Sequence, residues 1–93
     1  MKTAIIQIGN SDDKLTQKEW SEFCSELHHS ISGNQIHFHG FSSGHESWQN
    51  GCWVFSTTEI AIEALRKHVL PSLCKEFKQD SIALTIGDTE FIK

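Results

Sequence analysis

The stretch that decides the fold is Thr16–Ile31, TQKEWSEFCSELHHSI. Its first four residues have the spacing of a capping box, in which the side chains of Thr16 and Glu19 each accept a hydrogen bond from the other's backbone amide. Apolar side chains then recur at helical spacing and form one continuous stripe: Trp20, Phe23, Cys24, Leu27 and Ile31. The pattern predicts an amphipathic helix that ends at Ser32-Gly33-Asn34, with Gly33 able to adopt a positive φ.

A second helix is predicted after Ser56-Thr57-Thr58-Glu59, which has the spacing of another capping box. Apolar residues again follow at helical spacing: Ile62, Leu65, Val69, Leu73 and Phe77. Pro71 lies inside this pattern, lacks a backbone N–H and clashes in a regular helix with the carbonyl four residues earlier. We therefore expect a kink or a break in the helix at Pro71.

Four stretches have the apolar patterns of strands and flank the two helices: Thr3–Ile8, Gln35–Phe41, Cys52–Phe55 and Ser81–Ile86. The element order is therefore strand–helix–strand–strand–helix–strand, with a hairpin in the middle. This order predicts an α+β domain with the ferredoxin-like βαββαβ arrangement. We expect residues 1–93 to form a single domain, with a four-stranded antiparallel sheet and two helices on one face.

Composition excludes several classes of protein. The 93 residues include 12 acidic and 8 scattered basic side chains, a net charge of −4, so nucleic acid is not an expected partner. The three cysteines are odd in number and show no CxxC spacing, so no disulfide framework is expected. The sequence has no apolar run near the ~20 residues of a membrane span, and residues 1–8 lack the features of a signal peptide. We expect a reduced, cytoplasmic protein that needs no cofactor and has no membrane partner.

The sheet face away from the helices is expected to be partly apolar. It would carry one side of the Cys52–Phe55 strand and residues from the other strands: Ile5, Gln7, His37, His39, Phe41, Ala83 and Thr85. Large exposed apolar patches usually mark an interface. We therefore expect a homodimer formed through this face, or a partner that covers it.

The histidines suggest a metal site. His37 and His39 are separated by one residue, so in a regular strand both imidazoles project from the same face. His45 follows six residues later, in a predicted polar connection between residues 42 and 51. Two strand histidines and a third ligand from a loop suit Zn²⁺ or Fe²⁺ with an open coordination position. The alternative is that His37, His39 and His45 are solvated polar side chains without a metal. The pair His28-His29, near the end of the first helix, also needs no functional explanation, because the helix dipole favours positive charge there.

Two segments offer groups for a small polar ligand, namely the turn after the first strand and the stretch His45–Trp53. Both combine hydrogen-bonding side chains, and the second adds aromatic surfaces for stacking. The ligand-binding candidates are Asn10, Ser11, Asp12, His39, His45, Trp48, Gln49 and Asn50. The alternatives are a plain Asx-rich turn at residues 9–13, a Trp48 that covers its own core, and a hairpin turn at Gln49-Asn50.

Three segments resemble a group of small uncharacterised proteins of bacteria and their phages. They are Ile8–Gln17 with the following Glu19-Trp20, then Trp48–Trp53 and Gln79–Ala83. The resemblance covers less than a third of the residues but is spread along the chain. It brings no known activity, so it assigns no role to any residue. It implies a compact acidic protein of the kind that phages use to bind and disable components of host defence.

These patterns lead to three functional hypotheses. The first is a non-catalytic protein that binds a small polar or nucleotide-type ligand through the two polar segments. The second is a protein–protein inhibitor of the immunity, antitoxin or counter-defence kind, which docks its negative charge on a basic partner. The third is a metal-dependent enzyme that uses His37, His39 and His45. The binder hypotheses rank first, because no set of acid, base and nucleophile can be assembled from the sequence.

Overall fold

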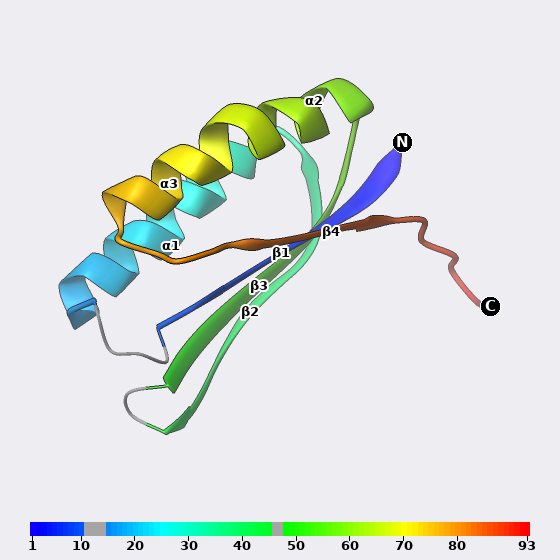
Figure 1. Cartoon of the computed structure of the whole chain (residues 1–93). Coiled ribbons are helices and arrows are strands. Elements are labelled where there is room, and N and C mark those ends of the chain that lie inside the picture. The colour runs from blue at the N-terminus through cyan, green and yellow to red at the C-terminus, as the bar shows by residue number, and fades with distance from the viewer. Residues whose placement is uncertain (11–14, 46–47) are drawn as a thin grey trace.

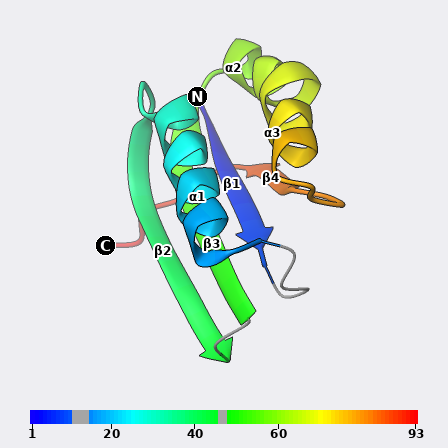
Figure 2. The same ribbon diagram turned by 90° about the vertical axis from the view of Figure 1, so that its left-hand side faces the viewer.

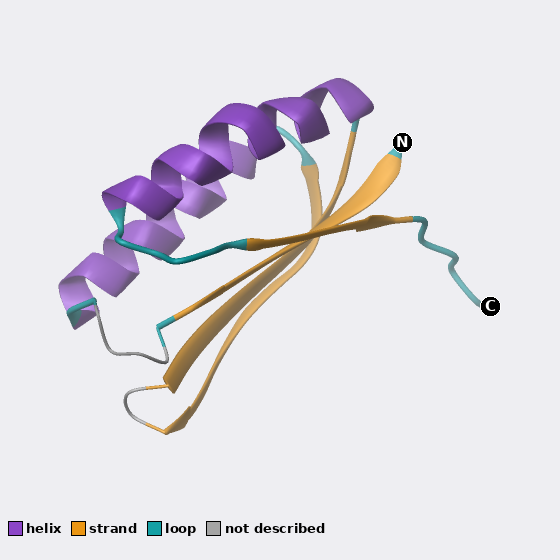
Figure 3. Cartoon of the chain, viewed as in Figure 1, coloured by secondary structure: helices purple, strands orange, loops and turns teal. Residues whose placement is uncertain are grey.

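The computed structural model describes residues 1–10, 15–45 and 48–93, without the side chains of residues 42–45 and 48. The described chain forms four strands and two helical segments (Figures 1 and 3). The elements in order are β1 (Lys2–Gly9), α1 (Gln17–Ile31), β2 (Gln35–His45), β3 (Trp48–Thr57), α2 (Glu59–Ala64), η1 (Leu65–Val69), α3 (Leu70–Glu76) and β4 (Ala83–Gly87).

The strands form one antiparallel sheet in the order β2-β3-β1-β4. The segment containing α1 links β1 to β2 across β3, and α2-η1-α3 links β3 to β4 across β1. Both helical segments cover the same face, so the other face of the sheet has no helix on it (Figure 1). The α+β class and the four-stranded antiparallel sheet with two helices on one face are confirmed.

Helix α1 begins as predicted. The Glu19 amide donates to the Thr16 hydroxyl at 3.1 Å, and the Thr16 amide donates to the Glu19 carboxylate at 3.0 Å. This backbone hydrogen bond lowers the pKa of Glu19. The C-terminus differs from the prediction, because no glycine among the described residues, Gly33 included, has a positive φ. Instead, Ser32 caps the helix, and the Asn34 amide donates to the Ile31 carbonyl at 3.0 Å.

The second helical segment corrects two expectations. The cap is Thr58, whose hydroxyl accepts from the Ala61 amide, so the capping box predicted at Ser56 is wrong. No break occurs at Pro71, since α2, η1 and α3 follow one another without a gap. The irregularity lies one turn earlier, where η1 is a π-helix and the Leu70 amide donates to the Leu65 carbonyl. This wider turn gives the proline ring room next to the preceding carbonyls.

The polar connection predicted between residues 42 and 51 is mostly strand. Strand β2 continues to His45 and β3 begins at Trp48, with Phe41 paired to Gly51 and Ser43 to Gln49. Glycine, serine and asparagine disfavour strands locally, but the two arms of a hairpin supply each other with backbone partners. The hairpin is therefore longer than the apolar pattern indicates.

The core lies between the sheet and the two helical segments. Strands β1 and β3 contribute Ala4, Ile6, Ile8, Trp53 and Phe55, and the helical segments contribute Trp20, Phe23, Leu27, Ile31, Leu65, Leu70, Leu73 and Phe77. The fully buried Phe23 ring stacks on Phe77 with 4.8 Å between ring centroids, which joins α1 to the residue after α3. All four apolar positions that the structure buries on α1 belong to the predicted stripe.

Truncation of the Phe23 ring tests this packing. The Phe23→Ala substitution removes the stacked pair and leaves a cavity, so we expect the free energy of unfolding to fall by about 3–5 kcal/mol. Urea denaturation followed by tryptophan fluorescence measures the change. The matched control is Ile60→Ala, because Ile60 is 85% exposed and its loss should change stability by less than about 0.5 kcal/mol. Equal stability of the two variants would contradict the assigned core.

Candidate functional site

A bulge in β2 separates the two histidines that were predicted to share a face. The strand register shifts between Ile36 and Phe38, because Ile36 pairs with Phe55 and Phe38 with Val54. The extra residue is His37, so the alternation of side chains restarts after it. The expectation that His37 and His39 project from one face is therefore wrong.

The two imidazoles contact different layers of the molecule. His37 lies on the open face, where its Nε2 is 2.6 Å from the Ser56 hydroxyl. His39 lies on the helix side, and its ring centroid is 5.1 Å from that of His28 in α1. The side chain of His45 is outside the described part of the chain. Within the described residues no group of three His, Cys, Asp or Glu side chains could hold a metal ion, so the predicted metal site is not assembled there.

An amide network ties the end of β1 to α1 and β3. The Asn10 side chain is fully buried, donates to the Leu15 carbonyl at 3.1 Å and accepts from the Leu15 amide at 3.1 Å. Gln49 accepts a backbone hydrogen bond from Asn10 at 2.8 Å and forms a reciprocal side-chain pair with Gln17 at 2.9 and 3.0 Å. Asn10 and Gln49 thus both make contacts within the fold. The Asn10 side chain is fully buried, whereas that of Gln49 is partly exposed.

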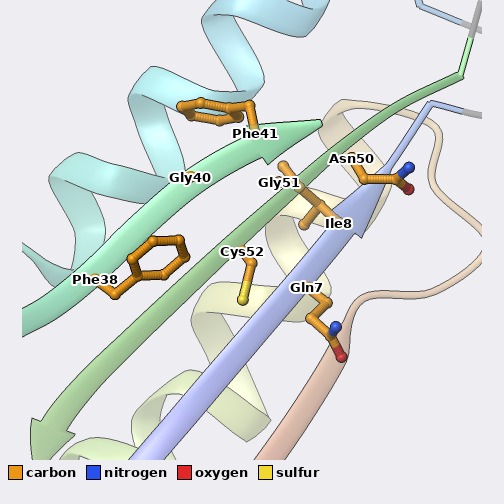
Figure 4. Close-up of a pocket in the computed structure, with 8 residues that line it drawn as sticks. All are labelled: Gln7, Ile8, Phe38, Gly40, Phe41, Asn50, Gly51 and Cys52. Carbon is orange, nitrogen blue, oxygen red and sulfur yellow. The ribbon is translucent and has the colours of Figure 1, made fainter. Parts of the chain in front are cut away.

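The open face contains a hollow of about 370 Å³ toward the hairpin end of the sheet (Figure 4). Its lining residues are Gln7, Ile8, Phe38, Gly40, Phe41, Asn50, Gly51 and Cys52. The Phe38 ring lies over Gly40, since a Cβ at that glycine would be 2.7 Å from the ring. The hollow therefore combines an aromatic surface, 56% exposed at Phe38, with the amides of Gln7 and Asn50.

A second hollow, of about 430 Å³, lies between α1 and β2. It is lined by Cys24, Ser25, His28, His29, Ser32, His39, Phe41 and Trp53. The Trp53 indole N–H donates to His28 Nδ1 at 3.1 Å, which fixes the His28 ring against the core. Sequence reasoning explained His28 by the helix dipole and missed this contact. The sequence feature that could have indicated this contact is the position of His28 directly after Leu27, at the border of the apolar stripe of α1.

Of the other ligand-binding candidates, Asn50 and His39 have described, exposed side chains. Asn50 lines the hollow of the open face, whereas His39 lines the hollow beside α1, so the structure does not bring these two together. Ser11 and Asp12 lie outside the described residues, as do the side chains of His45 and Trp48. The residues that sequence reasoning missed are Gln7, Phe38, Gly40 and Cys52, which only the strand pairing brings next to Asn50.

Comparison with known proteins gives no functional assignment. No family model matches the sequence, and no significant match occurs among curated proteins. In the described part of the chain, no helix has both the length and the apolar character required to cross a bilayer.

The role of Asn10 can be tested by truncating its amide. In Asn10→Ala the buried backbone groups of Leu15 lose their partners, so we expect a loss of about 1–3 kcal/mol in the free energy of unfolding. Asn50→Ala is the control, because Asn50 is an exposed amide at the neighbouring strand end. Its stability should stay within about 0.5 kcal/mol of the wild type in the same urea titration. An Asn10→Ala protein as stable as this control would show that the hydrogen bonds between Asn10 and Leu15 do not stabilise the fold.

The three cysteines are free thiols, and burial raises the pKa of Cys24 to about 11 and also raises that of Cys74. At pH 8 about one Cys24 thiol in a thousand is then a thiolate, the form that reacts. We expect alkylation of Cys24 by iodoacetamide at pH 8 to be roughly a hundredfold slower in the native protein than in urea. Peptide mass spectrometry measures the two rates. Equal rates would mean that the Cys24 thiol is not held in an apolar setting.

Proposed function

We propose that the protein is a non-catalytic binding protein that takes a small, planar, polar ligand in the hollow of its open sheet face. The observation that carries the proposal is the lining of that hollow, to which the exposed Phe38 ring contributes from one side and the amides of Gln7 and Asn50 from the other (Figure 4). The volume of about 370 Å³ is within the range of small-molecule sites, roughly 300–1,000 Å³.

The chemistry of the lining favours a ring with hydrogen-bonding edges, such as a nucleobase. A phenylalanine ring offers a stacking surface to any such ring, and each carboxamide offers both a donor and an acceptor. Gly40, which lies beneath the Phe38 ring, and Cys52 are small residues, so they leave space for a ligand in the hollow. Among the described residues no charged side chain lines the hollow, so the aromatic and amide groups there would supply most of the binding energy.

Binding without catalysis is the reading that the lining supports. General acid–base or nucleophilic catalysis needs several groups that converge on one atom. In the described part of the chain, Cys52 is the one residue lining the hollow that has a titratable side chain, and no described histidine or carboxylate joins it there. The metal-dependent alternative has no support in the described residues, because the bulge places His37 and His39 on different faces.

We further infer that the fold is of the ferredoxin-like type and that the protein works in a reducing compartment such as the cytoplasm. The strand order β2-β3-β1-β4 and the two crossovers over one face support the first inference. The three unpaired thiols support the second. The inhibitor alternative, in which negative charge docks on a basic partner, gains no support from the strands, which contain no acidic residue.

Thermal-shift measurements with a panel of nucleosides and nucleoside monophosphates test the proposed function. We expect at least one compound to raise the melting temperature of the wild-type protein. In Phe38→Ala its affinity should fall by about tenfold or more, because base stacking on an aromatic ring contributes about 1–3 kcal/mol. Asn50→Ala should weaken binding through the lost hydrogen bonds.

The control variant is Ile60→Ala, which removes an exposed apolar side chain from α2 on the opposite layer. Its affinity should equal that of the wild type. The proposal fails if no compound in the panel shifts the melting temperature, or if a compound shifts the wild type and Phe38→Ala equally.

A further inference from the structure

The four strands are almost free of charge. The chain has 12 acidic and 8 basic residues, yet Lys2 is the one residue of these types in β1, β2, β3 and β4. Lys2 alternates with the buried Ala4 and Ile6, so it does not belong to the open face. That face presents uncharged side chains from its two central strands: Thr3, Ile5, Gln7, Cys52, Val54 and Ser56. Depletion of charge is the compositional mark of the centre of a protein interface.

The open face is also uneven. After β4 the chain crosses it on the side away from α1, as Figure 2 shows by the segment that passes behind the strands toward β2. Asp88 forms an ion pair with Lys2 at 3.4 Å, and the hydroxyls of Thr89 and Thr3 are hydrogen-bonded. The Phe91 ring then reaches His37, with 6.1 Å between ring centroids. Residues 88–93, which we call the tail, thus form a ridge over the end of the sheet where β1 and β2 begin.

The ridge and the hollow lie at opposite ends of the same face. The tail contacts the first residues of β1, whereas the hollow is lined by Gln7 and Ile8 near its end. The tail carries apolar side chains that its own chain leaves in solvent, with Phe91 71% and Ile92 82% exposed. The open face therefore carries both the protruding apolar side chains of the tail and a hollow that is lined in part by apolar side chains such as Phe38 and Ile8.

We propose that a second copy of this chain covers the open face, with the tail of each copy lying over the mouth of the hollow of the other. A two-fold axis that runs across the strands, between two such faces, brings the ridge end of each copy over the hollow end of its partner. A two-fold interface must be complementary to itself, and a ridge and a recess on one face satisfy this requirement. Each hollow is then completed by Phe91 and Ile92 of the second copy.

Charge favours a second copy over an unrelated basic partner. Two copies carry −4 each, so they associate best through a surface whose centre buries no charged group, and the charged residues of the tail lie outside the strands. A basic partner would instead be matched by acidic residues on the contact face. The strands supply none, and of the two acidic residues of the tail, Asp88 and Glu90, Asp88 is already paired with Lys2. The dimer does not depend on a bound small molecule, but a ligand in the hollow would be enclosed by it.

Native mass spectrometry and analytical ultracentrifugation of the full chain test the dimer. We expect the wild type to dimerise, and Ile5→Lys to raise the dimer dissociation constant by about tenfold or more, because it places a charge at the centre of the face. Ile60→Lys is the matched control, since it adds the same charge at an exposed position of α2. A wild type that stays monomeric, or a dimer weakened equally by both substitutions, overturns the proposal.

Disulfide trapping tests the arrangement within the dimer. In Phe91→Cys the new thiol should lie next to Cys52 in the hollow of the second copy, so mild oxidation should give a covalent dimer. Peptide mapping should place the bond between residues 91 and 52 of different chains, and the added substitution Cys52→Ser should abolish it. Ile60→Cys controls for random collisions. A covalent dimer that forms equally with Ile60→Cys, or a bond within one chain, overturns the seating of the tail.

The trapping and the nucleoside panel give separate answers. A trapped dimer that binds no nucleoside would overturn the proposed ligand and leave the second copy in place. Nucleoside binding by a protein that stays monomeric would support the proposed ligand and overturn the second copy.

Discussion

The stacked rings of Phe23 and Phe77 hold the two helical segments together above the sheet. Phe23 comes from the middle of α1 and Phe77 from the residue that follows α3, so the contact closes the core between two separate crossovers. Both crossovers must cover the same face for these rings to meet. As a result the helices cover one face of the sheet and bury the inward side chains of its central strands β1 and β3, and the other face is available for other contacts.

A single extra residue in β2 determines which side chains that available face presents. If β2 were regular, His37, His39 and Phe41 would share one face, and Phe38 would point into the core. The bulge at His37 instead keeps Phe38 on the open face and turns His39 and Phe41 toward α1, where Phe41 meets Trp53 edge to face. The aromatic surface of the hollow and the separation of the histidines have this one local cause.

The parts of the fold that could be predicted from sequence are those fixed by neighbouring residues. The capping box at Thr16 and the apolar stripe of α1 depend on contacts within a few turns of helix, so their pattern is visible in the chain. The start of the second helix was misplaced by two residues, because Ser56 and Thr58 both offer hydroxyl groups and the choice between them depends on where β3 ends. Pro71 was expected to kink or break its helix. The helix is not broken, because a π-turn makes room for the proline, and such a turn has no recognisable sequence pattern.

The candidate site was less predictable, because it depends on pairing between strands that are distant in sequence. Asn50 was selected for its polar side chain, but its neighbours Gln7 and Phe38 come from other strands and become visible only with the register. Asn10 was selected for the same reason, but its side chain is buried and its amide is hydrogen-bonded to the backbone of Leu15. A buried and an exposed asparagine look alike in a sequence, and burial separates their roles.

The irregularities of β2 have a consequence for how this sheet can grow. Strand β2 lies at the border of the sheet, and its register shifts at two places, between Ile36 and Phe38 and between Ser43 and His45. Such interruptions spoil the regular row of amides and carbonyls that an incoming strand would need as a template. The protein is thereby protected against edge-to-edge polymerisation and fibril formation along β2, even though this strand is long and uncharged.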